Sequence, residues 1–171
     1  MNNIESTVVS TRIRLARNLA DYPFPNRLQS AKQAKEIVRI VAGAAGRLRH
    51  FKLYYMDEIT DRVALSLRDD HLISEQLASN KKYGAALIDE GDSDLFGERS
   101  SDKISIMINE EDHLREQYIA RGLNLGGAYV KISELDDSLS RTVHFAFDKK
   151  LGYLTACPTN LGTGLRASAM L

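Results

Sequence analysis

The chain has 171 residues, and its 23 Lys and Arg balance its 23 Asp and Glu, so its formal net charge is zero. A neutral chain of this length has no general basic surface for nucleic acid, and it is long enough for one domain with its own core. Its single cysteine excludes an internal disulfide and a multi-cysteine zinc site, and no apolar run approaches the roughly 20 residues of a membrane helix. The polar first residues predict no signal peptide, so we expect a cytoplasmic protein without membrane or direct nucleic-acid partners.

The N-terminal half is expected to alternate strands with helices. Residues 7–15 have strand composition, which would place Arg12 and Arg14 on one face, with Arg17 extending the basic cluster. Ser30 and Gln33 form a capping-box pattern at the start of a helix. The expected elements of this half are a strand at 7–15, a helix at 30–49, a strand at 51–56, a helix at 57–68 and a strand at 83–88.

The C-terminal half continues the mixture. The expected elements are a loop at 89–103, a strand at 104–108, a helix starting within 109–115, a helix at 128–145, a strand at 153–156 and a helix from about residue 163. Hairpin-like strands together with long helices favour an α+β fold, in which helices cover an antiparallel sheet.

Two arginines on one strand face are a poor choice for a core. Guanidinium groups match phosphate oxygens, so Ser10-Thr11-Arg12-Ile13-Arg14 suits a polyphosphate clamp. The alternative is a solvated strand face with surface ion pairs.

A second cluster runs from Asn109 to Arg115 and contains Glu110, Glu111 and Asp112. Its functional interpretation is a carboxylate that binds a cationic substrate beside an arginine that binds an anion. The alternative is an acidic first turn of a helix, which the helix dipole would stabilise.

The third cluster surrounds Cys157, which is followed by Gly162, Gly164 and Arg166. A thiol at a turn with free backbone N–H groups, hydroxyls and an arginine suits an anion site or a stabilised thiolate. The alternative is a structural core cysteine. His71 is a weaker candidate, since a lone histidine is more often a structural hydrogen-bonding residue.

These motifs, in this order, resemble the guanidino (phosphagen) kinase superfamily. They are Ser-Thr-Arg-Ile-Arg, Tyr-Pro-Phe-Pro, Asn-Glu-Glu-Asp-His-Leu-Arg and Cys-Pro-Thr-Asn-Leu-Gly-Thr. Within the superfamily, the chain is most similar to bacterial protein-arginine kinases. Only residues 1–11 precede Arg12, whereas creatine and arginine kinases carry a helical domain before this arginine motif.

The resemblance implies roles for individual residues. The segment 10–14, with Arg12 and Arg14, would bind the phosphates of ATP, which carries Mg²⁺. His71, Arg115 and Arg166 would also contact the nucleotide. Glu111 would align the guanidinium of the substrate and take its proton, Glu110 would lie beside that substrate, and Cys157 would pair with the guanidinium as a thiolate. No metal-ligating side chain is expected.

The implied fold is the guanidino kinase catalytic domain, a glutamine synthetase-like α+β fold, with residues 1–171 forming one partial domain. The implied reaction transfers the γ-phosphoryl group of ATP to arginine side chains in proteins. The alternatives are a kinase for a free guanidino metabolite and a non-catalytic module that binds nucleotide or a partner. An activator or regulatory protein and a homo-oligomer are further expectations.

Overall fold

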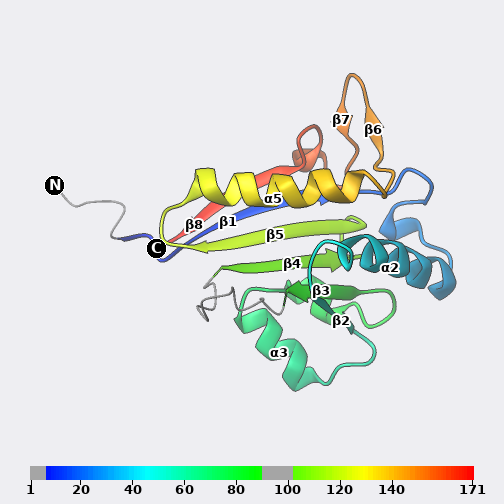
Figure 1. Cartoon of the computed structure of the whole chain (residues 1–171). Coiled ribbons are helices and arrows are strands. Elements are labelled where there is room, and N and C mark those ends of the chain that lie inside the picture. Colours follow the sequence, from blue (N-terminus) through cyan, green and yellow to red (C-terminus); the bar gives the residue numbers. More distant parts are fainter. Residues whose placement is uncertain (1–6, 90–101) are drawn as a thin grey trace.

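The computed structural model describes residues 7–89 and 102–171, which form a six-stranded antiparallel sheet with helices on both faces (Figure 1). The strands lie in the order β2–β3–β4–β5–β1–β8. They are β1 (Ser10–Arg17), β2 (Phe51–Tyr55), β3 (Ala85–Asp89), β4 (Lys103–Ile108), β5 (Leu114–Arg121) and β8 (Leu165–Met170). The helices are α2 (Ala31–Ala45), α3 (Asp61–Asp69), α4 (Glu75–Ser79) and α5 (Leu125–Ser140). The α+β class and the antiparallel sheet are therefore confirmed.

Smaller elements complete the chain. Strands β6 (Phe147–Asp148) and β7 (Gly152–Tyr153) pair as a short hairpin, and η1 (Pro25–Arg27) and η2 (Pro158–Asn160) are single 3₁₀ turns. No helix in the described part of the chain is long and apolar enough to cross a membrane.

Helix α2 illustrates how the sequence sets an element. The Ser30 hydroxyl accepts a hydrogen bond from the Gln33 backbone N–H, and the Gln33 side chain accepts one from the Gln29 backbone N–H. The buried stripe of the helix consists of Ala34, Ile37, Val38, Val41, Ala44 and Ala45. Because burying one large aliphatic side chain contributes about 1.5–3 kcal/mol, this stripe fixes α2 against the sheet.

Alternation along the strands gives the sheet two different faces. On one face, Ile13 and Leu15 of β1 pack with residues of α2 and α5 in the larger hydrophobic core. On the other face, Met107 of β4 packs with Leu67 of α3 and Leu77 of α4 in a smaller core. Among the described residues, the smaller core contains none from β1, β5 or β8. The polar side chains on that part of the second face therefore lie outside the smaller core.

The helix expected to start within 109–115 is wrong. Residues 109–113 form the turn of a hairpin, and β5 begins at Leu114. Asn109 has φ +57°, a left-handed conformation that asparagine tolerates better than most residues, and its backbone N–H donates to the His113 carbonyl. The acidic run therefore bends the chain between two strands, and its residues are not stabilised by a helix dipole.

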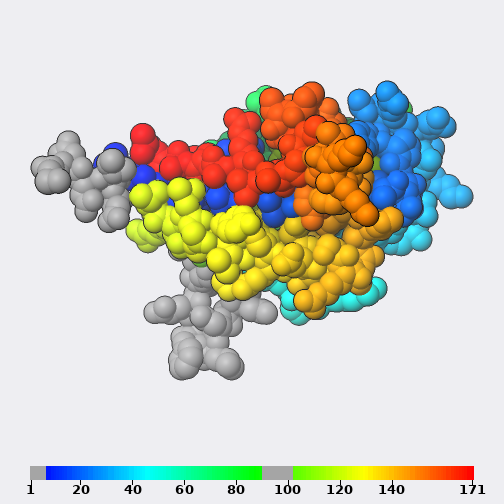
Figure 2. Space-filling view, turned by 90° about the horizontal axis from the view of Figure 1, so that it is seen from above, coloured from blue at the N-terminus to red at the C-terminus, as the bar shows by residue number. Residues whose placement is uncertain are grey.

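The helix expected from about residue 163 is also wrong. Residues 165–170 form β8, which pairs antiparallel with β1 along its length. The segment contains two alanines, which favour helices locally, but the ladder with β1 decides its conformation. From above, β8 (red) and α5 (yellow) form much of the visible surface (Figure 2).

Other boundaries differ by a few residues. Helix α5 begins at Leu125, so Gly126 and Gly127 lie in its first turn, and it ends at Ser140. The strand expected at 153–156 is reduced to Gly152–Tyr153. Val63 of α3 is exposed, whereas Ala64 and Leu67 are the buried residues of this helix. The loop expected at 89–103 lies mainly outside the described residues, and Lys103 already belongs to β4.

Candidate active site

Four arginine side chains lie on one face of the sheet although they come from three strands. Arg12 and Arg14 leave β1 on the face away from α2 and α5, since Ile13 between them belongs to the larger core. Arg14 lies opposite Arg166 of β8. Arg115 lies on β5 two positions from Gln117, the partner of Arg14, and so points to the same face.

The guanidinium groups of this cluster lie close enough to repel one another. The pKa of Arg14 is lowered to about 10, first by burial and then by the positive charges of Arg12, Arg115 and Arg166. The pKa of Arg12 is also lowered, first by burial and then by Arg166 and Arg115. A ligand with several negative charges would relieve this repulsion, so the cluster is suited to bind a polyphosphate.

Two neighbouring cavities open beside the arginines. The first has a volume of about 240 Å³ and is lined by Arg12, Arg14, Arg68, His71, Arg115 and Gln117, among others. The second has a volume of about 150 Å³ and is lined by Ser10, Arg12, His71, Ile119, Ser168, Ala169 and Met170. Because Arg12 and His71 line both, the two cavities adjoin. One is strongly basic and the other is partly apolar, which suits a ligand with a charged part and a less polar part.

His71 stands in a conformation that usually belongs to glycine. It follows α3 with φ +59°, its backbone N–H donates to the Arg68 carbonyl, and the Leu72 N–H donates to the Leu67 carbonyl. This is a Schellman-type helix end, in which the left-handed position is most often glycine. Gln117 supports the turn by donating from its side-chain amide to the His71 carbonyl at 2.6 Å. A histidine at such a position that also lines two cavities points to a functional role.

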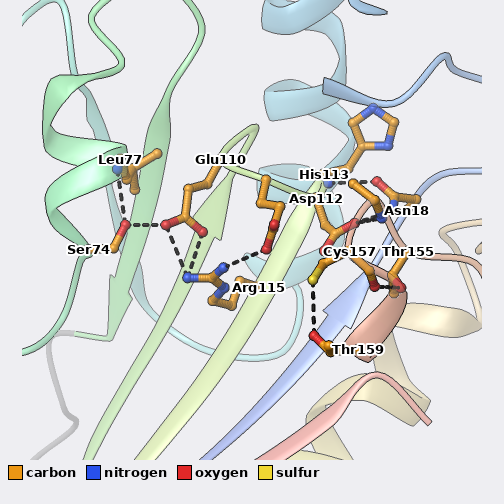
Figure 3. A network of polar contacts seen from close by, with 12 residues as sticks. Asn18, Ser74, Leu77, Glu110, Asp112, His113, Arg115, Thr155, Cys157 and Thr159 are labelled. Atoms are coloured by element: carbon orange, nitrogen blue, oxygen red, sulfur yellow. Dashed lines mark hydrogen bonds and ion pairs between the residues drawn. The ribbon is translucent and has the colours of Figure 1, made fainter. Parts of the chain in front are cut away.

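The turn between β4 and β5 holds Arg115 through two acidic residues (Figure 3). The Glu110 side chain is only 1% exposed, and its carboxylate lies 2.8 Å from Nη1 of Arg115. Ser74, the N-cap of α4, donates from its hydroxyl to the same carboxylate. Glu111 is more open, with 36% of its side chain exposed and a longer contact of 3.4 Å to Arg115. Glu110 therefore fixes Arg115, whereas Glu111 remains accessible to a substrate.

Cys157 is a free, half-buried cysteine at the start of the η2 turn. Its sulfur lies 3.0 Å from the Thr159 hydroxyl oxygen, and the Thr155 hydroxyl donates to its carbonyl oxygen at 2.9 Å (Figure 3). The half-buried thiol at an ordered turn differs from the fully buried core cysteine that was the alternative. Two residues after Gly164, which has φ +63°, the chain reaches Arg166 of the arginine cluster.

Two residues of the first motif, together with Arg17 that follows it, face away from the arginine cavities. Thr11 is fully buried, donates from its hydroxyl to the Gly122 carbonyl and accepts from the Asn124 N–H. Ile13 belongs to the larger core. Arg17, which we expected to extend the basic cluster, is instead buried in a bidentate ion pair with Asp136 of α5 at 2.8 and 2.9 Å. Of this motif, Ser10, Arg12 and Arg14 therefore remain beside the cavities.

Sequence reasoning missed several residues that shape the site. Ser74 and Gln117 hold Glu110 and His71, while Arg68 lines the basic cavity. Asn18 and Asp112 are buried and connect the acidic turn to the cysteine turn. No spacing in the sequence marks Ser74, Gln117 or Arg68, but Asp112 stood within an acidic run that was already a candidate. Within the described residues, no group of three or more His, Cys, Asp or Glu could hold a metal ion.

Comparison with protein families decides the class of this site. Residues 32–171 match the family model described as ATP:guanido phosphotransferase, C-terminal catalytic domain. The chain belongs to the ATP:guanido phosphotransferase family. It is 46% identical over 172 residues to a protein-arginine kinase of Geobacillus stearothermophilus, and 46% identical over 177 residues to one of Clostridium novyi. These matches cover 96% and 99% of the chain but only 44% and 47% of the relatives, so it spans less than half of their length.

Solved structures of the family share the fold. The duplicated taurocyamine kinase from Schistosoma mansoni, solved with bound transition state analog components, superposes with a TM-score of 0.82 at 26% identity. The match covers 98% of this chain and 24% of that one. A lombricine kinase superposes with a TM-score of 0.77 at 24% identity over 95% of this chain and 47% of that one, which supports the fold alone. The expected guanidino kinase fold is confirmed, and the chain covers part of it.

Proposed function

We propose that the chain is the nucleotide-binding part of the catalytic domain of a protein-arginine kinase. Its reaction would transfer the γ-phosphoryl group of ATP to a guanidinium nitrogen of an arginine side chain in a protein. The observation that carries this proposal is the convergence of Arg12, Arg14, Arg115 and Arg166 on one sheet face. The family match and the protein-arginine kinases at 46% identity support it.

The arginine cluster would hold the phosphates of ATP. Four guanidinium groups neutralise the triphosphate and the charge that spreads over the transferred group, which is the main task in phosphoryl transfer. His71 and Ser10 line the neighbouring, partly apolar cavity, so we assign the nucleoside end of ATP to it. Of the segment 10–14, Thr11 and Ile13 would act only by shaping the strand.

A Mg²⁺ ion fits this site as a companion of ATP. The described residues contain no three-ligand acidic or histidine group, and the nearby Glu110 is already engaged by Arg115 and Ser74. Mg²⁺ commonly takes phosphate oxygens and waters as ligands in kinase sites, so the nucleotide would supply most of its contacts. When bound, the ion would add to the charge neutralisation at the phosphates.

Glu111 and Cys157 would act on the acceptor. In the reaction, a guanidinium nitrogen forms a bond to the γ-phosphorus, the bond from that phosphorus to the β–γ bridging oxygen breaks, and ADP leaves. The nitrogen also loses a proton, for which the accessible Glu111 carboxylate is the proposed acceptor. Cys157, as a thiolate, would pair with the positive guanidinium and orient it. Glu110 would act indirectly, through Arg115.

The acceptor class has one serious competitor. The structural similarity to taurocyamine kinase at 26% identity makes a free guanidino compound the second candidate substrate. We favour protein arginine because the relatives with that name are much more similar in sequence, at 46% identity. We further propose a cytoplasmic enzyme that forms homo-oligomers and responds to a regulatory protein, and we regard residues 1–171 as one partial catalytic domain.

The test uses γ-³²P-labelled ATP with Mg²⁺ and two acceptors, an arginine-rich protein and free arginine. We expect acid-labile label on the protein and little on free arginine, and loss of most of the label with Glu111→Gln. Label on free arginine alone would establish the competitor. Binding of ATP without transfer to either acceptor would identify a nucleotide-binding module and reject the kinase activity of this chain.

A further inference from the structure

We propose that Asp112 and Asn18 are positioning residues that hold the Glu111 turn and the Cys157 turn in one fixed arrangement. The inference deepens the proposed function, because it names what aligns the two groups assigned to the guanidinium. Glu111 and Cys157 lie 46 positions apart in the chain, on separate turns. The two residues between which the acceptor would sit therefore need a physical link.

Asp112 provides the first link with a single oxygen atom. Its Oδ1 accepts a hydrogen bond from the Ala156 backbone N–H at 2.7 Å and another from the Asn18 side-chain amide at 2.6 Å. Asp112 immediately follows Glu111, and Ala156 immediately precedes Cys157. One carboxylate oxygen thus ties the backbone on one side of the proposed acceptor to the backbone on the other (Figure 3).

Asn18 provides the second link, from the loop after β1. Its side-chain Nδ2 donates to Asp112 and also to the Leu154 carbonyl at 3.1 Å, while its Oδ1 accepts from the His113 backbone N–H at 2.9 Å. The same side chain therefore contacts both turns, and no more than 2% of either Asn18 or Asp112 is exposed. Hydrogen bonds buried in this way are costly to break, so they restrict the two turns strongly.

The geometry separates this role from direct participation in the reaction. Both hydrogen bonds of Asp112 use Oδ1, whereas Oδ2 is buried and has no hydrogen-bond partner among the residues that the structure describes. Asp112 is too enclosed to touch a substrate, and the charge of its carboxylate is not required for either bond. Asparagine at position 112 could keep the Oδ1 acceptor and both bonds. Alanine would lose both.

The experiment compares Asp112→Ala and Asn18→Ala with the matched control Asp112→Asn. Three quantities are measured on the full chain: the rate of Cys157 alkylation by iodoacetamide, the affinity for ATP, and arginine phosphorylation. Alkylation needs no catalysis, so it reports on the hydrogen bonds of Asp112 and Asn18 even if the proposed kinase activity fails. Circular dichroism melting confirms that each variant is folded.

We expect both alanine variants to alkylate at least about threefold faster, because the cysteine turn opens more often. Their phosphorylation rate should fall roughly a hundredfold while ATP affinity stays within about twofold, since misplacement of about 1 Å costs that much in rate. Asp112→Asn should stay within about threefold of the wild type in all three measurements, because it keeps the acceptor. The double alanine variant should phosphorylate arginine little more slowly than either single variant, because each single substitution already breaks the same link between the two turns.

Several results would overturn the proposal. Asp112→Asn behaving like Asp112→Ala would mean that charge, rather than the shared acceptor, is required. An unchanged alkylation rate in both alanine variants would mean that Asp112 and Asn18 do not hold the cysteine turn in place. Loss of ATP affinity in parallel with turnover would make the two residues general supports of the fold. If Asp112→Ala does not fold, Asn18→Ala decides the outcome by the same criteria.

Discussion

Replacing Arg14 by glutamine should stabilise the empty protein and weaken its binding of ATP. Arg14 is surrounded by three other guanidinium groups, and its pKa is lowered to about 10 by burial and by Arg12, Arg115 and Arg166. A pKa lowered in the folded state means that the protonated side chain costs folding energy at every pH below 10, where it is charged in both states. That cost starts to shrink as the pH rises through the folded pKa, and it is gone only above the ordinary guanidinium pKa.

The magnitude follows from the size of the change. Lowering the Arg14 pKa from its ordinary guanidinium value to about 10 corresponds to roughly 3 kcal/mol. Because Arg14 is only half-buried, solvent screening reduces the usable part to about 1 kcal/mol. The lost charge-assisted contacts to phosphate should weaken ATP binding by about 1.5–3 kcal/mol, or ten- to a hundredfold.

The assay is urea unfolding at low and at 0.5 M salt, followed by calorimetric titration with ATP. Arg62→Gln, at an exposed position of α3, is the matched control and should change neither quantity. The gain of Arg14→Gln in unfolding free energy should shrink at high salt, because salt screens the repulsion. A less stable Arg14→Gln protein with unchanged ATP affinity would refute the reasoning, since it would make Arg14 an ordinary structural side chain.

Three further predictions concern single side chains. His71→Gly should keep or raise the melting temperature, because glycine suits φ +59°, but lower ATP affinity; a destabilised variant with full affinity would contradict the assignment. Glu111→Gln should remove most phosphoryl transfer while calorimetry still detects ATP binding, and joint loss of both would move Glu111 to the nucleotide side. His113 is fully buried; the Leu19 N–H donates to its Nδ1, and its Nε2 lies 3.0 Å from the Pro23 carbonyl. Burial lowers its pKa to about 4, so its neutral form stabilises the fold above pH 6.5, and roughly 3 kcal/mol is lost as the pH falls from 6.5 towards 4. The difference in unfolding free energy between wild type and His113→Gln should shrink over that range, and a constant difference would contradict the prediction. Burial raises the pKa of the Glu116 carboxyl, so its effect on stability has the opposite sign. Because Glu116 is present in both proteins, its effect cancels in the difference.

The sequence predicted those features that depend on local pattern. The capped helix α2, strand β4 and the alternation of Arg12 and Arg14 with core residues could all be read from spacing. The helix that we expected from residue 163 failed because the alanines of 165–170 favour a helix locally, whereas the ladder with β1 is a contact between distant segments. The helix expected within 109–115 also failed to form. An acidic run resembles the first turn of a helix, and no sequence pattern marks the left-handed conformation of Asn109 that turns the chain into a hairpin.

The candidate site was predicted in the same uneven way. The motifs identified the arginines because guanidinium groups are chemically conspicuous, and a basic strand face has few structural uses. Ser74 and Asn18 were not found, because a serine or asparagine that orients another residue looks like any cap or turn residue. Arg17 was misassigned, since only the position of Asp136 on α5 distinguishes a buried structural arginine from a ligand-binding one.

The central claim is that four arginines from three strands form one polyphosphate clamp. Calorimetric titration of the chain with AMP, ADP and ATP tests this claim without requiring turnover. The affinity should rise with each added phosphate, and this dependence should flatten in a variant in which Arg14 and Arg166 are both replaced by glutamine. Equal affinities for the three nucleotides in the wild type would contradict the clamp, because they would mean that the arginines do not contact the phosphates.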